Sequence, residues 1–272
     1  MNTATIIGLG AFAGLTIFLG LPVARVRSAG QRTRTFLVGA SAGVLIFLLV
    51  DILNQAGEPV GAAAAARDWA HLAGYGLVYV IGFGVGLLSL VYLSAWQKRR
   101  LRRSSIGPGA MAVAERLATP QTEALRTGMA IATGIGLHNF SEGLAIGQSA
   151  SKGAMSLALV LIIGFALHNA TEGFGIGGPL AAAQVQAPWR WLLVAGIVGG
   201  GPTFLGTVVG ASFTSPVAFV GCLALAAGAI LYCVGELFAA GRRMAWNIVV
   251  WGLMGGFLVA FGTDLVLKAA GA

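Results

Sequence analysis

The chain has 272 residues, of which 57% are hydrophobic and 10% are charged. Soluble domains carry about 25% charged residues, so this composition excludes an ordinary soluble domain and predicts an integral membrane protein. The apolar runs are long and continuous, which predicts an all-α fold rather than the short alternating strands of a barrel. The net charge is +8, but the basic residues lie beside the apolar runs, so we expect no nucleic-acid partner.

Eight apolar stretches are long enough to cross a hydrocarbon core, which needs about 20 residues per helix. They lie at about residues 4–24, 35–54, 72–95, 124–148, 154–177, 191–210, 216–238 and 244–267. We expect residues 1–272 to form a single transmembrane domain with a cytoplasmic loop at about 97–123.

The basic residues indicate which side of the membrane each loop occupies. Fourteen of the 17 Lys and Arg residues follow the first, third, fifth and seventh stretches. The positive-inside rule then places both termini outside the cytoplasm. We therefore expect a multi-pass protein of the cell inner (plasma) membrane, surrounded by membrane lipid.

The second and third stretches carry two isolated polar residues. Asp51 lies near the outer end of the second stretch, where it can contact the wet interface or form an entrance that attracts cations. The poly-Ala run at 62–66 indicates a helical extension of a neighbouring span. His71 begins the third stretch, and we interpret it as an interface residue rather than a ligand.

Two related motifs dominate the fourth and fifth stretches. They read LHNFSEGLAIG (137–147) and LHNATEGFGIG (167–177), and seven of the eleven positions are identical. In each motif His and Glu are four residues apart, so a helix presents both on one face. The short connection makes the two helices antiparallel neighbours with both His residues at similar depth. Ionisable residues inside a membrane indicate function, and the predicted metal ligands are His138, Asn139, Glu142, His168, Asn169 and Glu172.

The last three stretches contain a Gly-Pro motif that can disrupt its helix and a further glutamate, Glu236. GGGPTFLG (199–206) should bend or interrupt its helix, because proline removes a backbone donor and glycine is flexible. Glu236 lies near the cytoplasmic end of the next helix, one turn from Cys233. It either forms an inner metal site or pairs with Arg242 and Arg243.

Histidine nitrogen and carboxylate oxygen together favour borderline divalent cations. Mg²⁺ and Ca²⁺ prefer shells of oxygen alone, and Cu⁺ prefers sulfur. We expect no prosthetic group, only a transported divalent metal, with Zn²⁺ first and iron, manganese, cobalt or cadmium as further candidates. The two glutamates would offset a dication whose isolated burial would be prohibitive.

On these motifs the chain resembles the ZIP (Zrt/Irt-like) family of divalent metal transporters, in a prokaryotic form with diverged motifs. The fourth and fifth helices of that family typically carry HNxPEG and a related PEG motif, which here read HNFSEG (138–143) and HNATEG (168–173). The resemblance implies eight helices, outside termini and movement of metal toward the cytoplasm. It also implies an inner-end metal position at Glu236, within VGEL.

Two departures from the family pattern matter. Ser141 and Thr171 replace the motif proline, and we expect them to bend the helices less, through hydroxyl bonds to an earlier carbonyl. In many members helix 6 supplies a carboxylate that bridges two metals, whereas the comparable stretch here is GGGPT. This second departure predicts a single metal at the centre.

The sequence thus predicts a transporter of divalent transition-metal cations and not an enzyme. Two other functions stay open. An intramembrane metalloenzyme would need a metal-activated water and a base, but neither motif is HExxH and no separate base stands beside them. A non-transporting metal sensor would be compatible with both departures. The expected partners are metal ions and lipid, and a homodimer is left open.

Overall fold

The computed structural model describes residues 3–25, 30–103, 120–151, 155–212 and 215–269. In this part of the chain all regular structure is helical and no strand occurs. Most of the cytoplasmic loop expected at about 97–123 lies outside the described residues. In chain order the elements are α1 (Thr3–Leu15), α2 (Ile17–Gly20), the 3₁₀ turn η1 (Leu21–Arg25), α3 (Gln31–Ala65), α4 (Trp69–Arg103), α6 (Pro120–Ser151), α7 (Met155–Ala182), α8 (Trp189–Gly210), α9 (Pro216–Gly241) and α10 (Trp246–Ala269).

Seven described segments are long and apolar enough to cross a membrane. They are α1 to η1 taken together, α3, α4, α7, α8, α9 and α10. Helix α6 has 32 residues but is less apolar, because it carries Glu123 and Arg126 in addition to its motif. The all-helical class and its multi-pass character are confirmed, whereas the eighth span and the side on which the termini lie stay predictions.

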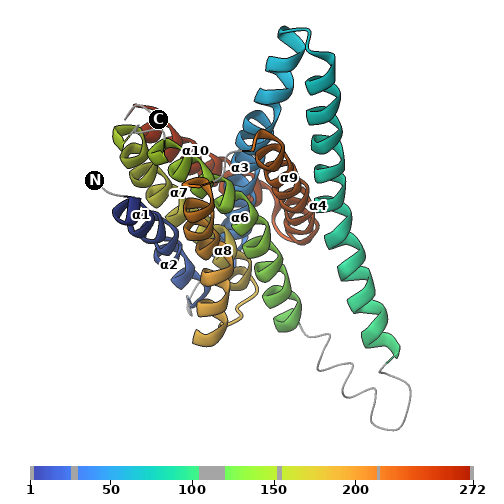
Figure 1. Ribbon diagram of the computed structural model, residues 1–272. Helices are drawn as coiled ribbons and strands as arrows, with labels where there is room; N and C mark the ends of the chain where they lie inside the picture. Colours follow the sequence, from blue (N-terminus) through green and yellow to red (C-terminus); the bar gives the residue numbers. More distant parts are fainter. Residues whose placement is uncertain (1–2, 26–29, 104–119, 152–154, 213–214, 270–272) are drawn as a thin grey trace.

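Helix α3 continues through the poly-Ala run to Ala65, as the sequence predicted. Its 35 residues give a length of about 52 Å at 1.5 Å per residue, well beyond a hydrocarbon core of about 30 Å. The hairpin of α3 and α4 accordingly projects beyond the other helices (Figure 1). Arg67 makes the turn with a φ of 57°, and the Asp68 carboxylate accepts the backbone N–H of His71 at 3.1 Å.

The helices pack as two groups around a shared middle (Figure 1). In one group α3 packs against α10 and α9, and α4 packs against α9. In the other group α8 packs against α6 and α1, and α7 packs against α6 and the α1 to η1 segment. Helices α6 and α7, which carry the paired motifs, contact α9, α3 and α10 of the first group. The motifs therefore lie in the middle of the bundle.

The predicted interruption of α8 does not occur, and the first span is broken instead. Pro202 does not interrupt α8, which runs unbroken from Trp189 to Gly210. The carbonyl of Val198, which proline deprives of its helical donor, lies against Gly136 on α6, where no Cβ blocks its approach. The break comes instead at Thr16, between α1 and α2. Its hydroxyl lies 2.7 Å from the Ala13 carbonyl and 2.6 Å from the Ala166 carbonyl, and such bonding bends helices.

Helices α1 and α8 cross at a point where only glycine fits. A Cβ built on Gly14 would overlap the Gly200 carbonyl oxygen, and one built on Gly200 would overlap the Gly14 carbonyl oxygen. Small residues allow this close approach between membrane helices. The crossing holds α1 and α8 together on the side of α6 and α7 away from α3.

We expect Gly14→Ala to destabilise the protein by about 1–3 kcal/mol, the usual cost of overpacking, and so to lower its melting temperature in detergent. Gly8→Ala is the matched control on the same helix, because its Cβ would meet nothing within 4 Å and alanine favours a helix. Equal melting temperatures for the two variants would show that the crossing is not tightly packed.

Candidate metal centre

The paired motifs place four ionisable side chains between α6 and α7. His138 and Glu142 lie one turn apart on α6, and His168 and Glu172 lie one turn apart on α7. Their exposed fractions are 1%, 5%, 7% and 0%, in that order. The helical period directs each pair to one face, so the predicted half-sites face each other in the bundle interior.

The ligand atoms of the two helices converge on a small volume. Nε2 of His138 lies 3.3 Å from Oε1 of Glu142 and 3.9 Å from Oε1 of Glu172. Nε2 of His168 lies 3.5 Å from the same Glu172 oxygen. One ligand atom each from His138, Glu142 and His168 can be chosen so that all lie within 4.8 Å of one another.

These separations suit a shared cation. Two ligands about 2.0–2.1 Å from one tetrahedral Zn²⁺ are about 3.3–3.4 Å apart, and the His–Glu pair within each helix, at 3.3 Å on α6 and 3.5 Å on α7, matches that spacing closely. The two ring centroids of His138 and His168 are 6.2 Å apart, consistent with their predicted similar depth. Glu172 reaches both imidazoles, so the two half-sites form one centre rather than two.

Many polar atoms of the centre have no hydrogen-bond partner among the described residues. They include both ring nitrogens of His138, one carboxylate oxygen of Glu142 and both of Glu172. Buried polar atoms are nearly always satisfied, because leaving them unpaired is costly. The described part of the chain does not supply hydrogen-bond partners for these atoms, and a coordinated cation would satisfy them.

The two asparagines are held by the flanking helices. Asn139 donates its amide N–H to the Gly199 carbonyl of α8 at 3.0 Å. Asn169 donates in the same way to the Ala13 carbonyl of α1 at 3.0 Å. Each bond fixes the carboxamide by its nitrogen and leaves the Oδ1 atom, fully buried, without a hydrogen-bond partner in the described chain. Both amide oxygens are therefore available as neutral ligands.

The proline replacements in the two motifs act differently. Thr171 donates its hydroxyl to the His168 carbonyl at 2.7 Å, the backward bond that the sequence predicted. The Ser141 hydroxyl is buried and has no such partner among the described residues. Both α6 and α7 run through the motifs without a break.

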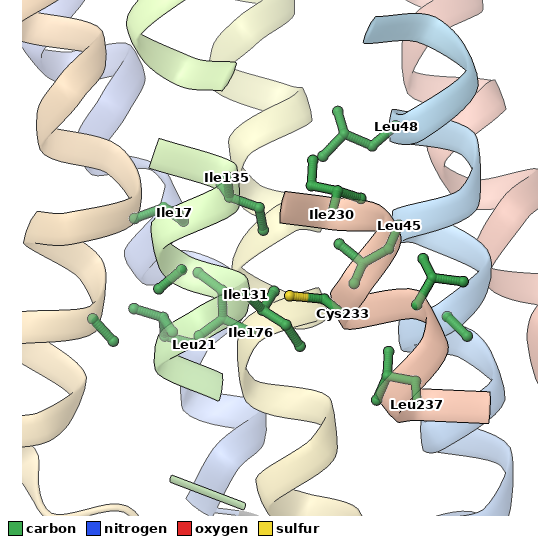
Figure 2. Close-up of a cluster of buried hydrophobic side chains, with 14 of the residues drawn as sticks. Ile17, Leu21, Leu45, Leu48, Ile131, Ile135, Ile176, Ile230, Cys233 and Leu237 are labelled. Atoms are coloured by element: carbon green, nitrogen blue, oxygen red, sulfur yellow. The ribbon is translucent and has the colours of Figure 1, made fainter. Parts of the chain in front are cut away.

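A cluster of buried apolar side chains (Figure 2) includes residues one helical turn from the centre on both α6 and α7. Ile135 precedes His138 by one turn on α6, and Ile176 follows Glu172 by one turn on α7; both are fully buried. Leu45 of α3 and Cys233 of α9 belong to the same cluster (Figure 2). The cluster keeps the local dielectric low, which strengthens charge interactions and raises the cost of an unpaired charge.

Asp51 lies outside the cluster but in electrostatic contact with it. It is partly exposed on α3 and accepts a hydrogen bond from Gln55 at 2.6 Å. It interacts electrostatically with His138 and with Asp264 of α10. The sequence suggested no site role for Asp264. It did place one carboxylate near the outer end of the last predicted span, as Asp51 is near the outer end of the second.

Glu236 is also separate from the centre. It is partly exposed on α9 and interacts electrostatically with Tyr232 and Cys233. The predicted alternative partners, Arg242 and Arg243, form no ion pair with it in the part of the chain that the structure describes. An inner metal site at Glu236 stays a prediction.

His71 lies far along the α3 to α4 hairpin and is exposed. Its ring Nδ1 is 2.7 Å from an Asp68 carboxylate oxygen. The backbone N–H and the ring of His71 lower the pKa of the Asp68 carboxyl below its ordinary value. His71 contributes no atom to the centre, and its place at the membrane interface stays a prediction.

No protein-family model matches the chain, and no curated protein matches it. The geometry of the centre is therefore the main evidence for what the protein does.

We expect the purified protein to bind one Zn²⁺ per chain at the centre, measured by isothermal titration calorimetry. His138→Ala should weaken this binding at least about tenfold, since it removes one of few strong ligands. His71→Ala is the matched control and should bind as the wild type does. Two cations sharing Glu142 or Glu172 at about 4 Å, the spacing of paired-metal centres, would contradict the single site.

Proposed function

We propose that this protein transports divalent transition-metal cations across a membrane through the centre on α6 and α7, with Zn²⁺ the first candidate. One observation carries the proposal. Two imidazoles and two carboxylates are buried together in mid-bundle, at ligand spacing, and most of their polar atoms have no hydrogen-bond partner among the described residues. A side-chain set of this kind is costly to bury unless a cation enters it.

The charges and ligand types support a mobile dication rather than a fixed structural metal. Glu142 and Glu172 together balance two positive charges, so the loaded centre is neutral and can exist in a low-dielectric interior. The Asn139 and Asn169 oxygens are weak neutral ligands. A site that mixes weak and strong ligands can release its ion, whereas closed structural zinc sites use four strong ones.

The route and direction of transport are also proposed. Asp51 would attract cations at the outer end of α3, and Glu236 would receive them on the cytoplasmic side. Helix α6 would be the eighth span, with both termini outside the cytoplasm. The resemblance of HNFSEG (138–143) and HNATEG (168–173) to the ZIP motifs supports movement toward the cytoplasm.

We expect Glu172→Ala to reduce Zn²⁺ uptake by proteoliposomes at least about tenfold, because Glu172 contacts both imidazoles and balances half the cargo charge. Glu58→Ala is the matched control, since Glu58 is an exposed carboxylate on the α3 extension, and its uptake should be unchanged. The Glu172 variant should still fold in detergent.

Near-normal uptake by Glu172→Ala would count against the proposed path. Zn²⁺ binding by the wild type with no flux would instead favour the sensor.

We expect Glu236→Gln to slow maximal uptake more than it weakens Zn²⁺ binding at the centre, because a carboxylate on the exit path acts on departure rather than capture. Parallel uptake and calorimetry would compare the two effects. If binding and uptake fell together, or if neither changed, Glu236 would not be a release site.

A further inference from the structure

His168 belongs to the centre, yet no hydrogen bond from the described chain orients its ring. Its Nε2 atom lies 3.5 Å from a Glu172 oxygen, and no hydrogen bond to the other ring nitrogen, Nδ1, occurs among the described residues. Histidines that bind metals almost always donate their second ring N–H to an acceptor, which fixes the orientation of the ring. Within the described chain, the orientation of His168 therefore depends on packing.

Phe47 of α3 supplies this packing. Its ring centroid lies 6.5 Å from that of His168, with the two ring planes inclined at 58°. Among the described residues, Phe47 is the only aromatic side chain from outside the centre whose ring contacts a histidine of the centre. Phe47 is 7% exposed, so the contact is buried and both rings have little freedom to turn.

The Phe47 ring is itself held by two rings of α10. It meets Phe257 at a centroid distance of 5.5 Å and an angle of 81°, and Phe261 at 6.2 Å and 65°. Phe257 and Phe261 are four residues apart, so they lie on one face of α10. Both contacts have the edge-to-face geometry and the spacing that aromatic pairs prefer. Phe47 thus has a defined position from which it contacts His168.

We propose that Phe47 is a positioning residue of the metal centre, which orients the His168 imidazole so that Nε2 faces the space shared with Glu172 and His138. The aromatic contact takes the place of the hydrogen bond that usually orients a metal-bound histidine. It also makes this ligand dependent on how α3 and α10 pack against α7. The inference rests on the proposed function, because it concerns the ligand set of the transport site.

The first test needs no metal. The chain has three histidines, so the ring signals of protein labelled with ¹³C-histidine can be assigned by NMR with His168→Ala and His71→Ala. Phe47→Leu keeps a large apolar side chain but removes the flat ring. It should broaden or split the single set of His168 signals expected for the wild type, and it should leave those of His71 unchanged. Wild-type His168 signals in Phe47→Leu would overturn the proposal.

Phe238→Leu is the matched control. Phe238 is a half-buried ring on α9, 6.2 Å from the ring of Trp246, and it contacts no histidine ring in the described chain. Its substitution removes an aromatic pair without reaching the centre, so the His168 signals should stay those of the wild type. An equal change in both variants would indicate a general loss of packing and would count against Phe47 as a positioning residue.

The second test uses Co²⁺, whose visible absorption reports the number and geometry of its ligands. Phe47→Leu should weaken Co²⁺ binding by about tenfold, the usual cost of losing a group that orients a metal ligand. Its spectrum should shift toward that of His168→Ala. A lower melting temperature with the wild-type spectrum and affinity would show that Phe47 only packs, and would overturn the proposal. If the wild type bound no Co²⁺, the proposed function would fail, whereas the His168 signals would still decide the role of Phe47.

Discussion

The burial of two carboxylates and two imidazoles between α6 and α7 is the constraint that the rest of the structure serves. These groups are buried, and Ile135 and Ile176 of the apolar cluster in Figure 2 lie one helical turn from them, so an unpaired charge is costly here. Most of their polar atoms have no hydrogen-bond partner among the described residues. A divalent cation would supply both the missing hydrogen-bond partners and the missing charge, and the transport that we propose would account for such a costly arrangement.

A near-symmetric packing scheme holds this centre in place. Asn139 binds the Gly199 carbonyl of α8, and Asn169 binds the Ala13 carbonyl of α1. Helices α1 and α8 in turn pack against each other where Gly14 and Gly200 meet. The repeated HN and EG motifs therefore give two antiparallel helices the same contacts in opposite directions. Each half-site faces the other, and Glu172 bridges the two imidazoles.

Periodicity and spacing were enough to predict the helices and to pair His138 with Glu142 and His168 with Glu172, because these relations depend on neighbouring residues along one helix. Contacts between helices could not be predicted in this way. The carbonyls that bind Asn139 and Asn169, the break at Thr16 instead of Pro202, and the link between Asp51 and Asp264 all depend on which helices pack together. The proposed role of Glu236 in releasing the cation depends on the path that the cation takes from the centre, which helix packing alone does not define.

Tracer counterflow tests the central claim most directly. Proteoliposomes that contain the wild-type protein would be loaded with unlabelled Zn²⁺ and then diluted into a trace of radioactive Zn²⁺. A centre that exchanges its ion across the membrane predicts a transient accumulation of tracer above its equilibrium level. Tracer that stays at the level of protein-free liposomes, although the protein binds Zn²⁺, would contradict transport through α6 and α7.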